Sequence, residues 1–230
     1  MNRKIIMIFI FLICLGNLRA LDIAITDKEI EGCMNAEFNR TLFFIGGLSE
    51  TVRIEFNDRL AVKGGGSLGW ARDITDIKLF ANAAYRPLAN LPLEVKFAWV
   101  YDDMPEFEVY SNAIAPFISW NAKYVGISVG IGFRLTSFFG ERNLFELLLP
   151  IKVYANFINN EKICFGMSFA NFNDFRMDSF ISFVLGLNVS FRIDELLAIV
   201  SELEYKHSGA DGLTSAFYGI AWKGGVKFKW

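Results

Sequence analysis

His207 and Ser208 are the residues whose types suit nucleophilic catalysis. His207 is the only histidine among the 230 residues, and Ser208 and Asp211 follow it in one polar segment. A serine that a histidine activates, with a carboxylate to orient the ring, is the arrangement that acyl transfer uses. Because adjacent residues of a strand face opposite sides, a bond between His207 and Ser208 requires the chain to bend there. We therefore expect a polar surface loop and keep a hydrolase as the alternative.

Charged residues recur with a spacing of two on the polar side of apolar segments. Alternate side chains of a strand point to opposite faces, so these charges would share one face with glycine and serine. The main candidates are Arg134, Lys152, Glu202, Glu204, Lys223 and Lys227, and the same face would carry Arg53, Glu55, Arg59, Lys63, Lys78, Glu94, Lys96, Lys162 and Lys206. Buried charges are costly unless they are paired or hydrated. Such a face therefore needs an ion-pair network or water.

The segment 216–230 shows this alternation most clearly. One of its faces is small or basic, and the other is apolar and aromatic, with Trp222, Val226, Phe228 and Trp230. The segment is long for a strand of a soluble protein, but its length suits a tilted strand that crosses a membrane.

Eleven further segments show the same pattern. We predict twelve strands in all, over residues 31–42, 50–57, 59–71, 75–86, 92–101, 107–120, 122–137, 145–158, 161–171, 179–193, 195–207 and 215–230. Ten strands is the alternative, because the first two are the weakest, and Pro116 predicts a bulge or bend in the sixth. Tight turns alternate with longer connections such as 171–178 and 207–215, which is typical of an antiparallel up-and-down membrane barrel.

Composition narrows the protein class. The chain is 53% hydrophobic and has a net charge of −2, which excludes a strongly basic nucleic-acid binder and a disordered acidic chain. Past the N-terminus, no apolar run is long enough for a membrane-spanning helix. Aromatic residues near strand ends favour a membrane barrel with two interfacial girdles: Trp70, Tyr85, Trp99, Tyr101, Trp120, Trp222 and Trp230. A secreted lipocalin-like barrel is the alternative.

The first twenty residues have the features of a secretory signal peptide. A short basic stretch precedes the apolar run Ile5–Leu15, and Ala20 stands at a cleavage position. Removal of residues 1–20 leaves one barrel domain, 21–230. It also leaves Cys33 and Cys164, both on the polar face of their strands, where a luminal disulfide between them is an alternative.

The signal peptide, the amphipathic strands and the aromatic last strand resemble those of Gram-negative or spirochaetal outer-membrane β-barrel proteins. The resemblance implies location in the cell outer membrane. It also implies that Trp222, Val226, Phe228 and Trp230 form the signal that the barrel-assembly machinery reads. The segment around His207 resembles the lipid A deacylase barrels as well, whose motif has one residue between histidine and serine.

The expected function is that of an integral outer-membrane barrel, either a small channel or a structural, surface-exposed barrel. A closed adhesin-like barrel and the lipid hydrolase that uses His207 and Ser208 are the alternatives. We expect no enzyme activity, cofactor or metal site. The expected partners are outer-membrane lipid, the assembly machinery and small solutes, with no nucleic acid. Pairing through the 207–215 loop would place Glu202 level with residues 219–221 and within reach of Lys223, so opposite charges would line the wall.

Overall fold

The structure is a computed structural model that describes residues 27–39, 44–56, 59–71, 74–88, 91–139, 142–179, 182–207 and 219–229. The predicted signal peptide, Ser208 and Trp230 lie outside these ranges. No helix of the described residues is long and apolar enough to cross a membrane.

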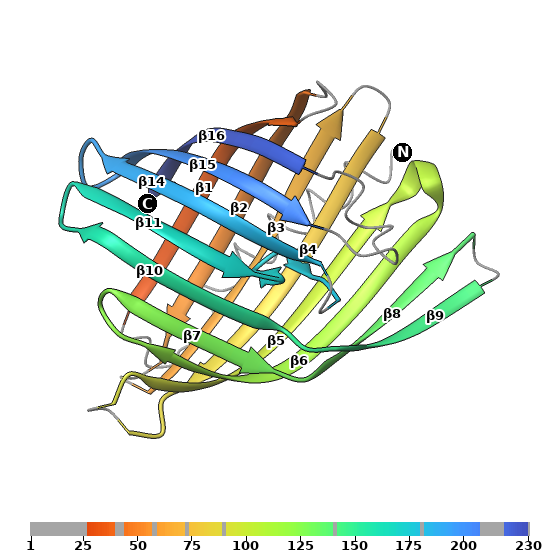
Figure 1. Cartoon of the computed structure of the whole chain (residues 1–230), viewed down its shortest axis with the longest axis horizontal. Coiled ribbons are helices and arrows are strands. Elements are labelled where there is room, and N and C mark those ends of the chain that lie inside the picture. Colours follow the sequence, from red (N-terminus) through yellow and green to blue (C-terminus); the bar gives the residue numbers. More distant parts are fainter. Residues whose placement is uncertain are drawn as a thin grey trace.

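The described residues form a closed antiparallel β-barrel (Figure 1). Its strands are β1 (Asp27–Asn39), β2 (Phe44–Glu55), β3 (Leu60–Ala71), β4 (Ile74–Tyr85), β5 (Leu93–Met104), β6 (Val109–Asn121), β7 (Val125–Gly130), β8 (Gly132–Phe138), β9 (Arg142–Leu148), β10 (Ile151–Asn159), β11 (Ile163–Ala170), β14 (Phe183–Arg192), β15 (Leu197–His207) and β16 (Gly219–Lys229). The 3-10 helix η2 (Pro105–Phe107) joins β5 to β6. The pairing of β1 with β16 closes the ring.

Two of the wall strands are broken in the middle. β7 and β8 both pair with β6, and β10 and β9 pair with β7 and β8 in turn. Counting each broken pair as one strand, the described wall has twelve strands. The all-β fold and the strand number predicted from the sequence are therefore confirmed, and the alternative of ten strands is wrong.

The expected bend at Pro116 lies in the neighbouring strand instead. β6 is continuous through Pro116, whereas the break between β7 and β8 falls at Ile131, whose N–H donates to the carbonyl of Pro116. In an antiparallel pair, the N–H and C=O of one residue point to the same neighbour. Because proline has no N–H, the ladder on that side loses a bond at this point, and the partner strand gives way.

The second strand begins earlier than predicted, at Phe44 instead of residue 50, and the first already includes residues 27–30, before the predicted start at residue 31. Residues 40–42 of the predicted first strand lie outside the described residues. Residues 42–48 look like a poor strand because they are apolar and rich in glycine. In the structure, Gly46 lies opposite Trp70 of β3, and the indole would contact any Cβ added at Gly46. A cross-strand aromatic ring that covers a glycine compensates for its missing side chain.

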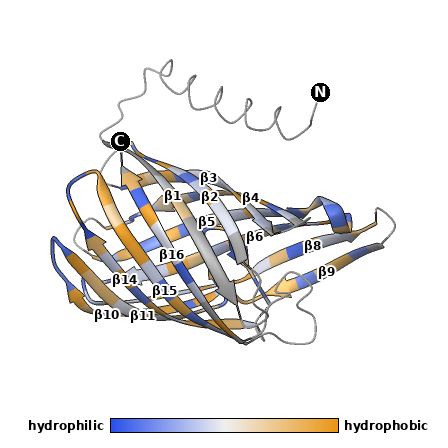
Figure 2. Ribbon diagram, turned by 90° about the horizontal axis from the view of Figure 1, so that it is seen from above, coloured by the Kyte–Doolittle hydropathy of each residue, from blue (hydrophilic) through white to orange (hydrophobic). Residues whose placement is uncertain are grey.

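Hydrophobic and hydrophilic residues alternate along many strands (Figure 2), and the exposure of the side chains places the apolar set on the outer face and a mixed set on the inner face. Along β5, Val95 and Phe97 are exposed, whereas Glu94, Ala98 and Asp102 are buried. An outward apolar face is the reverse of what a water-soluble barrel presents. We call the end with Asp27 and Lys229 the terminal end and the opposite end, which carries the connection 171–182, the loop end.

Candidate functional site

The connection after β11 turns into the lumen, the interior of the barrel. The backbone of Asn171 bonds with the carbonyl of Ile151 at 3.1 Å, and its side chain accepts from the Ile151 N–H at 2.6 Å and donates to the Leu149 carbonyl at 2.8 Å. Asn171 thus spans the break between β9 and β10. Beyond it, the wall next to β9 carries no further strand among the described residues, because the chain now runs inward.

The inward segment is a short hairpin, which we call the luminal hairpin (residues 172–177). It consists of β12 (Phe172–Asn173) and β13 (Arg176–Met177). The N–H of Asp178 donates to the carbonyl of Asn171 at 2.8 Å and closes its base. The sequence predicted an ordinary longer loop at 171–178, so the placement of this segment inside the barrel is a correction.

Apolar contacts hold the luminal hairpin against the β4–β6 wall. Phe175 meets Phe80 edge-on, with ring centroids 4.8 Å apart, and Phe172 meets Phe117 at 5.1 Å. Met177 is buried in the same cluster, together with Ala98, Val100, Ala113, Ala115 and Leu148. Part of the lumen is therefore a hydrophobic core instead of a polar passage.

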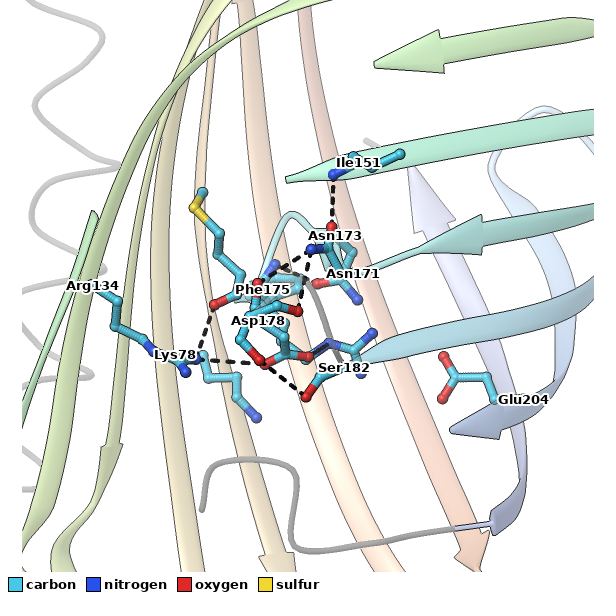
Figure 3. Close-up of polar contacts among 12 residues, drawn as sticks. Lys78, Arg134, Ile151, Asn171, Asn173, Phe175, Asp178, Ser182 and Glu204 are labelled. Carbon is cyan, nitrogen blue, oxygen red and sulfur yellow. Dashed lines mark hydrogen bonds and ion pairs between the residues drawn. The ribbon is translucent and has the colours of Figure 1, made fainter. Parts of the chain in front are cut away.

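Polar contacts fix the two ends of the hairpin. At its tip, Asp174 accepts from Lys63 Nζ at 2.7 Å and from Asn82 Nδ2 at 3.1 Å. At its base, Arg134 of β8 reaches toward the hairpin and Asp178 (Figure 3). It donates to Glu146 of β9 at 2.6 Å and to the carbonyl of Met177 at 3.2 Å.

Asp178 completes this cluster at the base. Its carboxylate lies 3.8 Å from Arg134 Nη1 and 2.7 Å from Arg176 Nε. The side chains of Arg134 and Asp178 are almost fully buried. Buried charges of opposite sign therefore tie β8, β9 and the hairpin together.

Opposite charges also line the β14–β16 wall, across the lumen from the apolar cluster. Lys223 lies opposite Glu202 in register and forms an ion pair of 2.8 Å with Glu204. The register expected from the sequence was wrong, because it placed Glu202 level with residues 219–221. In the structure, Glu204 lies opposite Ala221 and Glu202 opposite Lys223, and residues 215–218 of the predicted strand lie outside the described residues.

Cavities lie among the described residues inside the barrel, and two of them touch the hairpin. One of about 330 Å³ lies against Phe172 and Arg176 and is lined by Lys152, Glu202 and Glu204. A second, of about 310 Å³, is lined by Glu202, Lys223, Cys33 and Cys164. The third, of about 230 Å³, lies toward the terminal end and is lined by Arg53, Glu55, Arg59, Lys63, Arg86, Glu94, Lys96, Asp174 and neighbouring residues.

The remaining sequence candidates are distributed as follows. Lys227 lies opposite Cys33 in β1, and Lys162 is exposed in the terminal-end turn instead of in the lumen. No disulfide joins Cys33 to Cys164. The backbone of His207 ends β15 opposite Phe183; Ser208 lies outside the described residues, so the hydrolase alternative stays a prediction. Arg134 lies with the hairpin base, in a cluster separate from Lys152, Glu202, Glu204 and Lys223.

The sequence analysis did not predict the luminal hairpin or the roles of Asp174 and Asp178, whose carboxylates fix its tip and base. One sequence signal could have revealed the hairpin. Phe80, Val100 and Phe117 stand on the polar face of their strands, where a water-filled lumen offers them no apolar partner. The connection 171–178, with two phenylalanines and a methionine after Asn171, is the segment that could supply one.

Comparison with known proteins relates the chain to solved structures alone. No protein-family model matches the sequence, and a search of curated proteins finds no match. The translocator domain of the autotransporter NalP from Neisseria meningitidis is similar with a TM-score of 0.53 and 12% identity, over 94% of this chain and 93% of that one. The NanC porin is similar with a TM-score of 0.57 and 10% identity, over 89% and 100%. The KdgM porin in complex with disordered oligogalacturonate has a TM-score of 0.57 and 6% identity, over 88% and 99%. The chain therefore has the fold of the outer-membrane β-barrels, and these likenesses identify no subfamily.

Proposed function

We propose that the barrel is an outer-membrane channel for small polar solutes, and that the luminal hairpin sets the width of its passage. The observation that carries the proposal is the set of cavities of about 230, 310 and 330 Å³ inside the barrel, each with charged side chains of both signs in its lining. The first and the last of them also touch the hairpin. Barrels of about eight strands are filled by their own side chains, whereas wider ones leave water inside. Twelve strands with one inserted hairpin leave room for a narrow hydrated path.

The described ion pairs leave no continuous ring of one charge sign around the lumen. Lysine, arginine and carboxylates alternate around the lumen, as in the pairs Lys223–Glu204 and Lys63–Asp174. A ring of one sign would select one class of ion, and the described pairs form no such ring. The proposal assigns no catalytic step to the barrel.

Single-channel conductance of the refolded full-length mature chain tests the proposal. The matched variant replaces residues 172–177 with Gly-Gly. The base bond between Asn171 and Asp178 would then close a two-residue turn, which Gly-Gly suits. We expect measurable conductance for the wild type and a larger unitary conductance for the variant. Folded barrels that carry no current in either form would contradict the proposal.

A further inference from the structure

The cavity near the terminal end differs from the other two in its charge. Five cationic side chains line it, Arg53, Arg59, Lys63, Arg86 and Lys96, against three carboxylates, Glu55, Glu94 and Asp174. Among the described residues, the lining of the cavity thus has an excess of two positive charges. The cavity of about 330 Å³ balances Lys152 and Arg176 against Glu202 and Glu204, and the one of about 310 Å³ balances Lys223 against Glu202.

The ion pairs inside this cavity concentrate several cations on few carboxylates. Glu94 accepts from Arg86 at 2.8 Å and from Lys96 at 2.7 Å, and Asn121 also donates to it at 2.9 Å. Arg53 donates through both Nε and Nη2 to a single oxygen of Glu55. A guanidinium has five N–H donors and an ammonium three. Each of these cations therefore has more donors than the bonds to Glu55 and Glu94 use.

The cations are also reachable from water. The side chains of Arg53 and Arg86 are 41% and 44% exposed, and that of Lys63 is 34% exposed. Their charges are therefore hydrated and can exchange water for a ligand, unlike the buried charge of Arg134. A cavity of about 230 Å³ has room for a small anion.

We propose that this cavity, which we call the cationic vestibule, binds small solutes that carry a carboxylate or phosphate group. Charge-assisted hydrogen bonds from guanidinium to such oxygens are short and roughly twice as strong as neutral ones. The inference rests on the proposed channel function and deepens it, because it names the class of solute that the lumen retains. The vestibule lies on the terminal-end side of the hairpin tip, where Asp174 already forms an ion pair with Lys63 of the vestibule.

Isothermal titration calorimetry of the refolded barrel in zwitterionic detergent at low salt tests the proposal. The probes are inorganic phosphate, malonate and, as a neutral molecule of similar size, glycerol. Phosphate and malonate should bind and glycerol should not, and added NaCl should weaken binding through screening. Arg59→Gln and Arg86→Gln should each weaken phosphate binding by about tenfold, the loss expected for one charge-assisted hydrogen bond.

Lys123→Gln is the matched control. Lys123 lies in a turn at the same end, outside the vestibule, with its ammonium over the ring of Tyr124. Its removal should leave binding unchanged, and a gel-mobility assay of heated and unheated samples verifies that each variant is folded. Absence of phosphate and malonate binding, or an equal loss in Lys123→Gln, would overturn the vestibule. Because calorimetry measures equilibrium binding, a barrel that conducts without binding overturns only this inference, and one that binds without conducting overturns only the channel.

Discussion

Lys63 and Asp174 are 111 residues apart in sequence, and their side chains meet at 2.7 Å inside the barrel. This contact joins the wall to the tip of the luminal hairpin. Both side chains keep more than a third of their surface exposed, and ion pairs of this kind contribute about 0–1 kcal/mol. The buried ring of Phe172 contributes more, since a fully buried phenylalanine is worth about 1.5–3 kcal/mol.

The first prediction separates these two contributions. Phe172→Ala should lower the free energy of unfolding by about 3–5 kcal/mol, as expected for a buried ring that packs on Phe117. Asp174→Asn should cost no more than about 1 kcal/mol. Urea titrations in detergent micelles measure both. A larger loss for Asp174→Asn than for Phe172→Ala would mean that the tip, and not the apolar cluster, holds the hairpin.

The second prediction concerns Arg134. Arg134→Met removes the cation between Glu146 and Asp178 and leaves two poorly exposed carboxylates without it. Breaking a buried pair in this way costs about 3–5 kcal/mol. The matched change Arg53→Met removes a half-exposed partner of Glu55 and should cost about 0–1 kcal/mol. Equal losses in urea titrations of the two variants would show that Arg134 does not hold the wall break closed.

Much of the wall follows from local pattern. Alternation with period two assigns Leu185 to the lipid side and Glu204 to the lumen, because the pleat of a strand allows no other arrangement. The ends of strands are harder to predict from this pattern. The glycine-rich residues near Gly46 are part of β2, where Trp70 of the neighbouring strand β3 packs against them, and the local sequence does not show this contact.

The luminal hairpin could not be derived in the same way. Its partners Lys63, Phe80 and Arg134 come from three different strands, and a sequence pattern contains no information about which of them a loop will reach. The break opposite Pro116 can be predicted in part, because the sequence shows that residue 116 has no N–H. Which of the two neighbouring strands yields depends on the side to which that N–H would have pointed.

The third prediction tests the two faces on one strand. Leu185 of β14 is exposed on the outer face, and Ser190 of the same strand lines the cavity of about 310 Å³. Leu185→Arg places a charge against lipid and should cost about 2–4 kcal/mol if it lies near the bilayer midplane. Ser190→Arg should cost much less, because water can hydrate the new guanidinium and Glu202 can form an ion pair with it. Folding titrations into lipid vesicles compare the two variants, and equal losses would contradict the assignment of the faces.

The fourth prediction concerns the wall break itself. Gly130 ends β7, and a Cβ added there would lie 2.4 Å from Cβ of Phe117 and 2.5 Å from the carbonyl oxygen of Pro116. The oxygen belongs to the backbone of the continuous strand β6, so it cannot move away as a flexible side chain would. Gly130→Ala should therefore destabilise the barrel by about 1–3 kcal/mol, the usual cost of overpacking.

Gly64→Ala is the control for this change, because the nearest atom to its added Cβ, the carbonyl oxygen of Phe80, is 3.5 Å away. Glycine within a strand costs about 0.5–1 kcal/mol relative to alanine, so Gly64→Ala should stabilise the barrel slightly. The two variants make the same chemical change and should differ in sign, which urea titrations can resolve. Stabilisation by both would mean that β6 and β7 do not approach so closely at Pro116, and that the break at Ile131 has another cause.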